Sequence, residues 1–282
     1  MRNLFLDADK DAFFWKNGYV HVQGFLSNSE CETLKQLYYK REYSKKFKGF
    51  HRTLDSYDIK DKMAISKGID DIVSPKSKQH LFDYRYLLTS FMTKEPGAGP
   101  FDIHQNWTFV DERYFTSLVI WIPLQDTGEE NGTMYFVPGS HLLDKGVRGN
   151  NIRWKYDEIK EYLVNNHMIP VNMKAGDAVI FDDATIHYTS PNLSKEPRIS
   201  IAQVMIPEEA QPIFYNLHPA TGLLEKYAID KDFYHLFMNR YTKTFNFSDN
   251  ILLKSTPYQQ EQITIEAFET TIRSVHDANM QY

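Results

Sequence analysis

The chain has 282 residues, of which 32 are Lys or Arg and 37 are Asp or Glu, so its formal net charge is −5 at pH 7. Nucleic acid is therefore excluded as a favoured ligand, because phosphate binding needs a concentrated basic surface. The single cysteine, Cys31, excludes an intrachain disulfide framework and a cysteine-based zinc site.

The sequence also lacks the apolar runs of a targeting or membrane segment. Asp7, Asp9 and Asp11 interrupt the stretch where a signal peptide needs apolar residues, and no later run approaches ~18 consecutive apolar residues. We therefore expect a cytoplasmic protein that does not interact with a membrane. The length fits one β-sandwich or barrel, so we expect a single domain over residues 1–282.

Residues 1–85 are predicted to flank the core with a helix, a strand and a second helix. In residues 18–26, Val20 and Val22 alternate with polar residues, which is typical of a half-buried strand. The segment therefore predicts one strand with its valines facing inward.

The second helix is expected to begin near Ser29, which forms a capping-box pattern with Glu32. Leu34 shares a face of this helix with two further apolar residues. Residues 44–75 are polar and lack apolar periodicity, so we expect a surface excursion that acts as a mobile lid.

Residues 86–206 are predicted to form the core, because short apolar runs alternate there with turn residues such as Asn131-Gly132. Regularly spaced short strands predict a mainly β, jelly-roll architecture with flanking helices. The predicted strands are YLLTSFMT, SLVIWIPL, TMYFVPG, DAVIF and ISIAQVMI. Residues 207–282 are predicted to be a polar C-terminal extension with a final helix in EAFETTIRSVHDA.

Two histidines and one arginine stand out by their context. His104 follows a Gly/Pro-rich turn, His187 lies 83 residues later just after a predicted strand, and Arg198 follows after eleven more residues. Strands that are distant in sequence lie side by side in a jelly roll, so these side chains can converge. Imidazole suits Fe(II), and an arginine fork beside the Ser200 hydroxyl suits a carboxylate.

At these residues the chain resembles the phytanoyl-CoA dioxygenase family of iron(II)/2-oxoglutarate oxygenases. The resemblance covers residues 87–205 and consists of several blocks in the family's order and spacing. They are MTKEPGAGPFDIHQNW, IWIPLQDTGEENGTMYFVPGSH and KAGDAVIFDDATIHYTSPNLSKEPRIS.

The resemblance implies a double-stranded β-helix, a cupin-like jelly roll, that holds Fe(II) through His-x-Asp and a distal His and anchors 2-oxoglutarate on an arginine. His104 matches the first ligand and His187 the distal ligand. Arg198 and Ser200 match the co-substrate anchor, and Lys94 matches a lysine that approaches the co-substrate in some members. The implied reaction consumes O₂ and converts 2-oxoglutarate to succinate and CO₂ while it oxidises an unactivated C–H bond.

The sequence departs from the family where the carboxylate ligand is expected, because it reads His104-Gln105-Asn106. An amide oxygen is a weaker ligand because it is neutral. Asn106 either ligates through its carbonyl oxygen or leaves a position open for water or an anion. Alternatively, it is an inactivating substitution, natural or introduced, or marks a relative that binds without catalysis.

Two aspartates near Asn106 are weaker candidates for the missing ligand. Asp102 would lie about 6.6 Å along the strand from His104, and Asp111 is beyond easy reach. We therefore favour Asn106 or a water. Replacing Asn106 with Asp is expected to raise Fe(II) affinity, since a charged oxygen then replaces a neutral one.

The leading function is hydroxylation of a small molecule by a 2-oxoglutarate-dependent oxygenase. The alternatives are a non-catalytic 2-oxoglutarate- and metal-binding relative, and a redirected outcome such as halogenation or desaturation. A metalloenzyme that works without 2-oxoglutarate conflicts with Arg198 and Ser200. Residues 44–75 and 207–260 are expected to set the substrate, and their composition favours a small polar or amino-acid-like molecule over a lipid thioester.

Five further side chains near the predicted site have ambiguous contexts. Trp107 and Trp121 either line the substrate pocket or fill the sandwich. His141, in a turn, is expected to make a structural hydrogen bond. Asp182-Asp183 is expected to be a loop rather than an acid/base pair. The sequence leaves the oligomeric state open.

Overall fold

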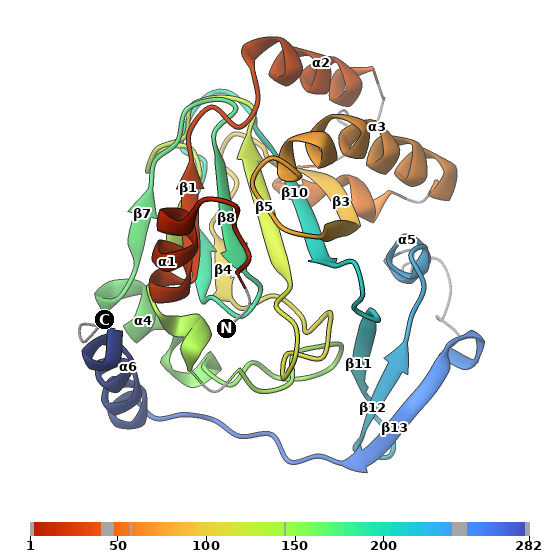
Figure 1. The fold of residues 1–282 in the computed structure, drawn as a ribbon, viewed down its shortest axis with the longest axis vertical. Helices are drawn as coiled ribbons and strands as arrows, with labels where there is room; N and C mark the ends of the chain where they lie inside the picture. The colour runs from red at the N-terminus through yellow and green to blue at the C-terminus, as the bar shows by residue number, and fades with distance from the viewer. Residues whose placement is uncertain (1–2, 41–47, 57, 144, 239–246, 280–282) are drawn as a thin grey trace.

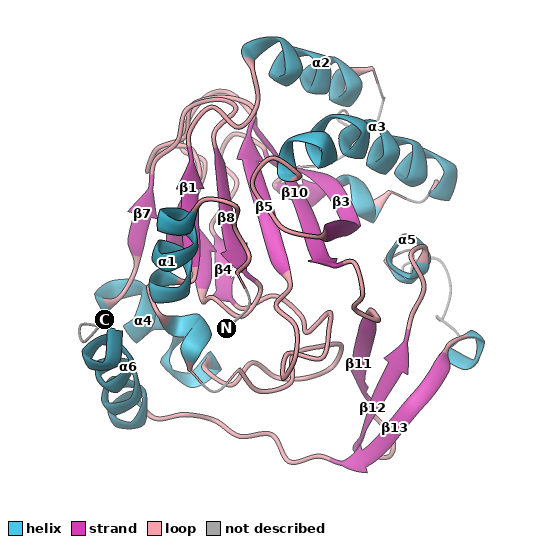
Figure 2. Ribbon diagram, viewed as in Figure 1, coloured by secondary structure: helices cyan, strands magenta, loops and turns pink. Residues whose placement is uncertain are grey.

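The computed structural model describes residues 3–40, 48–56, 58–143, 145–238 and 247–279. Side chains are described for all of these residues except Ser248. A six-stranded antiparallel sheet forms the centre of the molecule (Figures 1 and 2). In spatial order it consists of β1 (Tyr19–Val22), β8 (Ala178–Asp182), β5 (Leu118–Pro123), β10 (Arg198–Pro207), β3 (Tyr84–Lys94) and β2 (Phe50–Arg52).

A four-stranded antiparallel sheet supplies the second layer. Its spatial order is β4 (Phe101–His104), β9 (His187–Thr189), β6 (Met134–Phe136) and β7 (Ile169–Val171). The two sheets form the predicted double-stranded β-helix, so the mainly β jelly-roll prediction is confirmed. β1 and β2 come from the N-terminal flank, yet they pair with β8 and β3 of the central sheet.

The central strands are buried on both faces, because helices cover one face and the second sheet lies over the other. Every residue of β5 is buried, as is every residue of β8. Ile120 and Ile122 face the helices, whereas Val119 and Trp121 belong to the cluster that surrounds the interior between the sheets. This two-sided burial explains why β5 reads as a continuous apolar run.

The helical layer consists of α1 (Ala8–Asn17), α2 (Asn28–Tyr39) and α3 (Ile59–Ser77), which Figure 1 shows in red to orange. α2 has a capping box, but it joins Ser27 and Glu30: the Ser27 amide donates to Glu30 Oε2 over 2.8 Å. The predicted Ser29–Glu32 box was therefore displaced by two residues. Leu34 of α2 is fully buried, as the sequence predicts.

The prediction of a mobile surface lid over residues 44–75 was wrong where the structure describes it. Residues 44–47 lie outside the described residues, as does residue 57. β2, a 3-10 turn (Thr53–Asp55) and α3 form the remainder. Ile65, Ile69 and Val73 of α3 are buried against the central sheet. The pattern was obscured because polar Lys62 and Ser66 occupy the same buried face.

The C-terminal extension forms a third antiparallel sheet and two helices. β11 (Ile213–Leu217), β12 (Leu223–Ala228) and β13 (Ile251–Pro257) pair in sequence order, and α5 (Phe233–Phe237) lies between the last two along the chain. Figure 1 shows the chain returning from β13 to α6 (Ile265–Asn279) beside α4 (Lys160–Asn166). The predicted final helix is confirmed, and Phe268 and Ile272 bury its apolar side.

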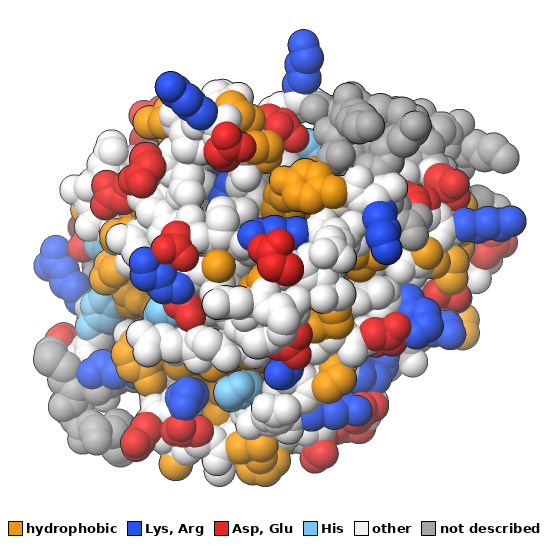
Figure 3. Space-filling model, turned by 90° about the horizontal axis from the view of Figure 1, so that it is seen from above, with side chains coloured by type: hydrophobic (Ala, Val, Ile, Leu, Met, Phe, Trp, Pro, Cys, Tyr) orange, Lys and Arg blue, Asp and Glu red, His pale blue; other side chains and the backbone are white. Residues whose placement is uncertain are grey.

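Positive and negative side chains are interspersed on the surface seen in Figure 3. No concentrated basic patch is visible on that face. Among the described helices, none is long and apolar enough to cross a membrane.

Candidate active site

A cavity of ≈ 270 Å³ lies between the two sheets. Its walls are largely apolar, and its polar lining residues include two histidines and an arginine. His104 and His187 come from the smaller sheet, whereas Arg198 comes from the central sheet. The structure therefore brings together the three residues on which the sequence-based hypothesis depends.

His104 and His187 are directly opposite each other across the β4–β9 pair. Their ring centroids are 4.2 Å apart. Each Nδ1 bonds to the backbone carbonyl two residues earlier: His104 to Asp102 O and His187 to Thr185 O, both at 2.8 Å. A carbonyl only accepts, so each Nδ1 carries the proton and each Nε2 keeps its lone pair available for a metal.

Burial reinforces the neutral form of both rings. It lowers the pKa of His104, and it lowers the pKa of His187 still further because His104 is close by. Neutral imidazole is the form that ligates metals. The pair therefore meets the chemical requirement for two nitrogen ligands on one ion.

Asn106 follows β4 and lines the same cavity. Its side-chain nitrogen donates to Asp183 Oδ1 over 2.8 Å. Polar contact with the Asn106 side chain also acts to raise the pKa of His104, which places the amide beside the first histidine. Among the described residues, no three His, Cys, Asp or Glu side chains converge on one point, in keeping with two histidines and a neutral third ligand.

The two alternative aspartates are engaged away from this point. The Asp102 carboxylate is exposed and pairs with Lys160 at 3.2 Å. Asp111 pairs with Arg113 at 2.6 Å and with Lys226 at 3.2 Å, and these cations hold its pKa below the ordinary range. Neither carboxylate replaces Asn106 in this arrangement.

Arg198 is 1% exposed, and its guanidinium donates to the Ser200 hydroxyl. It lies 5.2 Å from the centre of the Trp121 ring. Burial lowers its pKa to about 9, and no nearby carboxylate opposes that shift among the described residues. Arg198 Nε has no hydrogen-bond partner there. A buried guanidinium without a counter-ion is costly, so the site fits an anionic ligand.

Lys94 is opposite Arg198 in the β3–β10 pair. Its ammonium group donates to the backbone carbonyls of Thr189, at 3.0 Å, and of Ser190. Gly132 closes this corner with φ +90°, and a Cβ there would lie 3.3 Å from Arg198 Nε and 3.1 Å from Lys94 Cδ. The predicted anchor residues are therefore adjacent, and glycine leaves room beside the guanidinium.

Both predicted tryptophans line the cavity. Trp107 packs edge-on against Phe214 and Phe237, and Trp121 lies beneath Arg198. Their contact with a substrate stays a prediction.

Sequence reasoning missed other cavity residues. Thr189 lies two residues after His187 on the same strand face, a period-2 signal, and its buried hydroxyl has no partner among the described residues. Arg52 of β2 and Tyr234 of α5 also line the cavity. No local pattern marked these two residues, because only the tertiary fold brings β2 and α5 to the site.

Asp182 is the last residue of β8, and Asp183 lies in the turn that follows, in keeping with the expected loop. Both side chains are buried, Asp183 completely. Asp182 pairs with Lys145 at 3.1 Å. Burial raises the pKa of Asp183 to about 7, although contacts with Ser117 and Asn106 oppose the shift.

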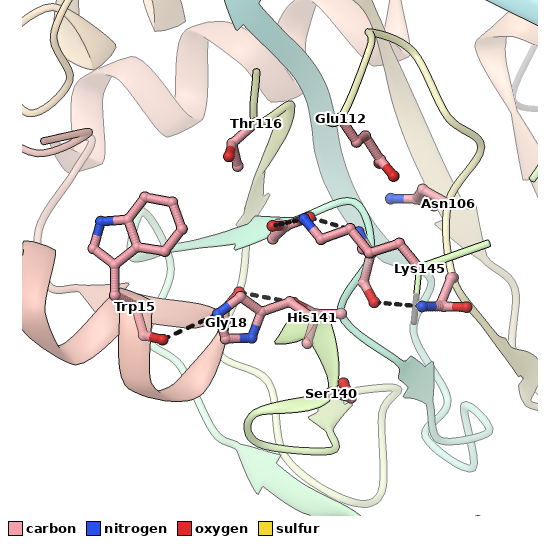
Figure 4. A network of polar contacts seen from close by, with 12 residues as sticks. Trp15, Gly18, Asn106, Glu112, Thr116, Ser140, His141 and Lys145 are labelled. Atoms are coloured by element: carbon pink, nitrogen blue, oxygen red, sulfur yellow. Dashed lines mark hydrogen bonds and ion pairs between the residues drawn. The ribbon is translucent and has the colours of Figure 1, made fainter. Parts of the chain in front are cut away.

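His141 makes the structural hydrogen bond that the sequence predicts. Its Nε2 donates to the backbone carbonyl of Trp15 over 3.1 Å (Figure 4). The side chain is fully buried, and burial lowers its pKa to about 4. His141 thus joins α1 to the jelly roll and takes no part in the candidate metal site.

Comparison with known sequences gives one family match. A family model described as "Phytanoyl-CoA dioxygenase (PhyH)" matches residues 14–200. A "Phytanoyl-CoA dioxygenase domain-containing protein 1 homolog" from Dictyostelium discoideum is 31% identical over 109 residues, which are 36% of this chain and 38% of that protein. A "Phytanoyl-CoA dioxygenase" from Arabidopsis thaliana is 30% identical over 116 residues, 40% of this chain and 41% of that protein.

Solved structures give the same fold. The carbocyclase SnoK from nogalamycin biosynthesis aligns with a TM-score of 0.56 at 19% identity, covering 73% of this chain and 86% of that one. The epimerase SnoN aligns with a TM-score of 0.53 at 21% identity, covering 91% and 92%. Both likenesses support the jelly-roll architecture.

Proposed function

The chain belongs to the phytanoyl-CoA dioxygenase family, and from that premise we propose that it is an Fe(II)/2-oxoglutarate-dependent oxygenase. One observation supports the proposal most directly: a single cavity holds a facing histidine pair and a buried arginine that has no counter-ion among the described residues. The pair offers two lone pairs to a cation, and the arginine offers a fork to a carboxylate.

The residues that line the cavity would hold the metal and 2-oxoglutarate in different ways. His104 and His187 hold the metal through Nε2, and Asn106 supplies an oxygen ligand or orders a water. Arg198 and Ser200 receive the far carboxylate of 2-oxoglutarate, while Lys94 fixes the β9 backbone beside it. When bound, iron and 2-oxoglutarate supply O₂ activation and the oxidation of a C–H bond, yielding succinate and CO₂.

Solved complexes of proteins with a similar fold support the proposal that this chain binds a metal and 2-oxoglutarate. SnoN has been solved in complex with Fe3+, alpha ketoglutarate and nogalamycin RO, and aligns here with a TM-score of 0.53 at 21% identity. HygX from Streptomyces hygroscopicus has been solved with nickel and 2-oxoglutarate bound, and aligns with a TM-score of 0.53 at 16% identity. The family match and the residues at the cavity extend this proposal to the present chain.

The substrate is proposed to be a small molecule with an apolar part. The first cavity carries mainly apolar and aromatic side chains beyond the histidines. A second cavity of ≈ 630 Å³ shares His104 and Trp107 with the first and presents Arg148 and Arg153. A molecule that spans both would place an apolar segment near the metal and a polar group outside it. The proposed substrate therefore has the polar group that the sequence led us to expect, together with an apolar segment that reacts.

Asn106 is the observation that favours a second function, a relative that binds metal and 2-oxoglutarate without turnover. A neutral ligand holds a divalent cation less firmly than a carboxylate does. Halogenation is less well supported, because the asparagine side chain occupies the space that a halide would need.

Succinate formation separates these functions. Protein loaded anaerobically with Fe(II) and 2-oxoglutarate is exposed to O₂, and succinate is measured against an iron-free control. Iron-dependent succinate supports the oxygenase, whereas tight binding of both ligands without succinate supports the non-catalytic relative. If neither ligand binds, the proposed function is wrong.

A further inference from the structure

Asn106 is held at three points by buried neighbours. Its backbone amide donates to Asp183 O over 2.9 Å, and its side-chain nitrogen donates to Asp183 Oδ1 over 2.8 Å. Arg148 Nε donates to the backbone carbonyl of Asn106 over 2.7 Å. One residue, Asp183, thus contacts both the main chain and the side chain of Asn106. Figure 4 includes Asn106 in the polar network that surrounds this contact.

The contact with Asp183 decides which end of the Asn106 amide faces the cavity. The NH₂ group is the end that faces Asp183, because it donates to Asp183 Oδ1. The carbonyl oxygen then turns away from Asp183. Asn106 lines the cavity together with His104, whereas Asp183 stands outside the lining. The amide therefore presents its oxygen, the atom that can ligate a metal, on the side of the histidines.

Burial of the Asp183 carboxyl group is energetically unfavourable. The Asp183 side chain is 0% exposed, and Oδ2 has no hydrogen-bond partner among the described residues. The nearby cations are engaged elsewhere: Arg148 pairs with Glu112 and Lys145 pairs with Asp182. A buried carboxyl group with so few partners destabilises the fold. Asn106 donates a 2.8 Å hydrogen bond to Asp183 Oδ1, and Ser117 is also in polar contact with the carboxyl group.

We propose that Asp183 is a positioning residue that holds the Asn106 amide with its carbonyl oxygen toward the metal, so that a neutral amide serves as the third protein ligand. This inference rests on the proposed function, because it concerns the same metal. Asp183 acts through Asn106 and does not touch the ion itself.

The hydrogen bond between Asn106 and Asp183 determines how the protein should respond when Asn106 is replaced by the aspartate that the family carries. Asn106→Asp alone sets two carboxyl groups against each other at a hydrogen-bond distance, where neither has a hydrogen to donate unless one is protonated. Adding Asp183→Asn restores one donor and one acceptor, with the direction of the bond reversed. The two positions are therefore expected to tolerate the aspartate at either place but not at both.

The test compares the wild type with N106D, D183N and the double variant N106D/D183N. Thermal unfolding is measured on metal-free protein, and Co(II) affinity is measured by calorimetry, with the Co(II) absorption spectrum as a report on the ligand set. Asp182→Asn is the matched control, because Asp182 is a neighbouring buried carboxylate that pairs with Lys145 instead of Asn106.

We expect D183N to bind Co(II) about 10- to 100-fold more weakly, the usual loss when a residue that orients a metal ligand is replaced. Its Co(II) spectrum should change, since the amide can then turn either end to the metal. N106D should melt below the wild type without metal, and the double variant should recover that loss and bind Co(II) more tightly than D183N. D182N should change stability without weakening Co(II) binding.

Wild-type Co(II) affinity and an unchanged spectrum in D183N would overturn the positioning role while leaving the proposed function intact. So would metal-free stability in N106D equal to that of the double variant, because it would show that the two side chains are uncoupled. A wild-type protein that binds neither Co(II) nor Fe(II) would overturn the proposed function and the positioning role together.

Discussion

His104 and His187 face each other across β4 and β9, and each ring is fixed by a 2.8 Å hydrogen bond from Nδ1 to the carbonyl two residues earlier. The same local contact on two strands gives both rings the same tautomer. The ring orientation is therefore set by the backbone before a metal arrives. Such preorganisation reduces the entropy that metal binding must offset.

Replacing either histidine should abolish tight metal binding. His104→Ala and His187→Ala each remove one nitrogen ligand, and we expect Fe(II) or Co(II) affinity to fall by at least about 100-fold, since one ligand of a three-residue site is lost. Calorimetric titration under anaerobic conditions measures the change. His276→Ala, at an exposed position on α6, is the control and should bind as the wild type does. Normal affinity in both site variants would place the metal elsewhere.

Arg198→Ala should weaken 2-oxoglutarate binding by about 1.5–3 kcal/mol, the worth of a hydrogen bond to a charged group. Arg198→Lys should recover only part of the loss, because an ammonium group lacks the planar fork. The measurement is 2-oxoglutarate titration of metal-loaded protein, with Arg113→Ala on the surface as the control. Equal 2-oxoglutarate affinity in the wild type and the Ala variant would remove Arg198 from the site.

His141 should make the fold sensitive to acid. Its pKa is about 4 in the folded protein, against an ordinary value of 6.5, so the unfolded chain binds more protons between these values. Stability should therefore fall as pH drops from 6.5 toward 4, by on the order of 3 kcal/mol from this group. His141→Gln keeps a donor for the Trp15 carbonyl but does not titrate there. Chemical unfolding across this pH range should give a flatter profile for the variant, and parallel profiles would refute the assignment.

The packing of α3 predicts a contrast between two of its residues. Ile69 is fully buried, whereas Met63 is 42% exposed. Ile69→Ala should lower the free energy of unfolding by about 2–5 kcal/mol through lost burial and a cavity. Met63→Ala should cost less than about 1 kcal/mol, as is usual for exposed positions. Urea unfolding measures both changes. A small effect of Ile69→Ala would contradict the packing of α3 against the core and would favour a loosely packed surface segment.

The strands and the principal site residues were predictable because their signals are local or coupled in sequence. The run through Ile120 and Ile122 is long and apolar, and His104, His187 and Arg198 lie in blocks with a fixed order. α3 was missed because Lys62 and Ser66 interrupt its apolar face, although both are buried in the structure. Burial of a polar residue depends on partners from distant elements, which a periodicity argument does not include.

The roles of Asp183 and Tyr234 lay beyond sequence reasoning for a different reason. Asp183 resembles any loop aspartate until the fold sets it against Asn106, which lies 77 residues earlier. Tyr234 reaches the cavity only because α5 packs beside the jelly roll, and its fully buried hydroxyl has no partner among the described residues. Such long-range pairings produce no periodic pattern in the chain.

The most direct test of the proposed oxygenase function is succinate production from 2-oxoglutarate by purified protein with Fe(II) and O₂. The wild type is compared with His187→Ala and with Arg198→Ala, assayed below saturating 2-oxoglutarate. The proposed function predicts iron-dependent succinate in the wild type, none above background in His187→Ala, and a reduced rate in Arg198→Ala that rises with 2-oxoglutarate concentration. Equal succinate formation in the wild type and His187→Ala would contradict it, as would a wild-type protein that binds neither Fe(II) nor 2-oxoglutarate.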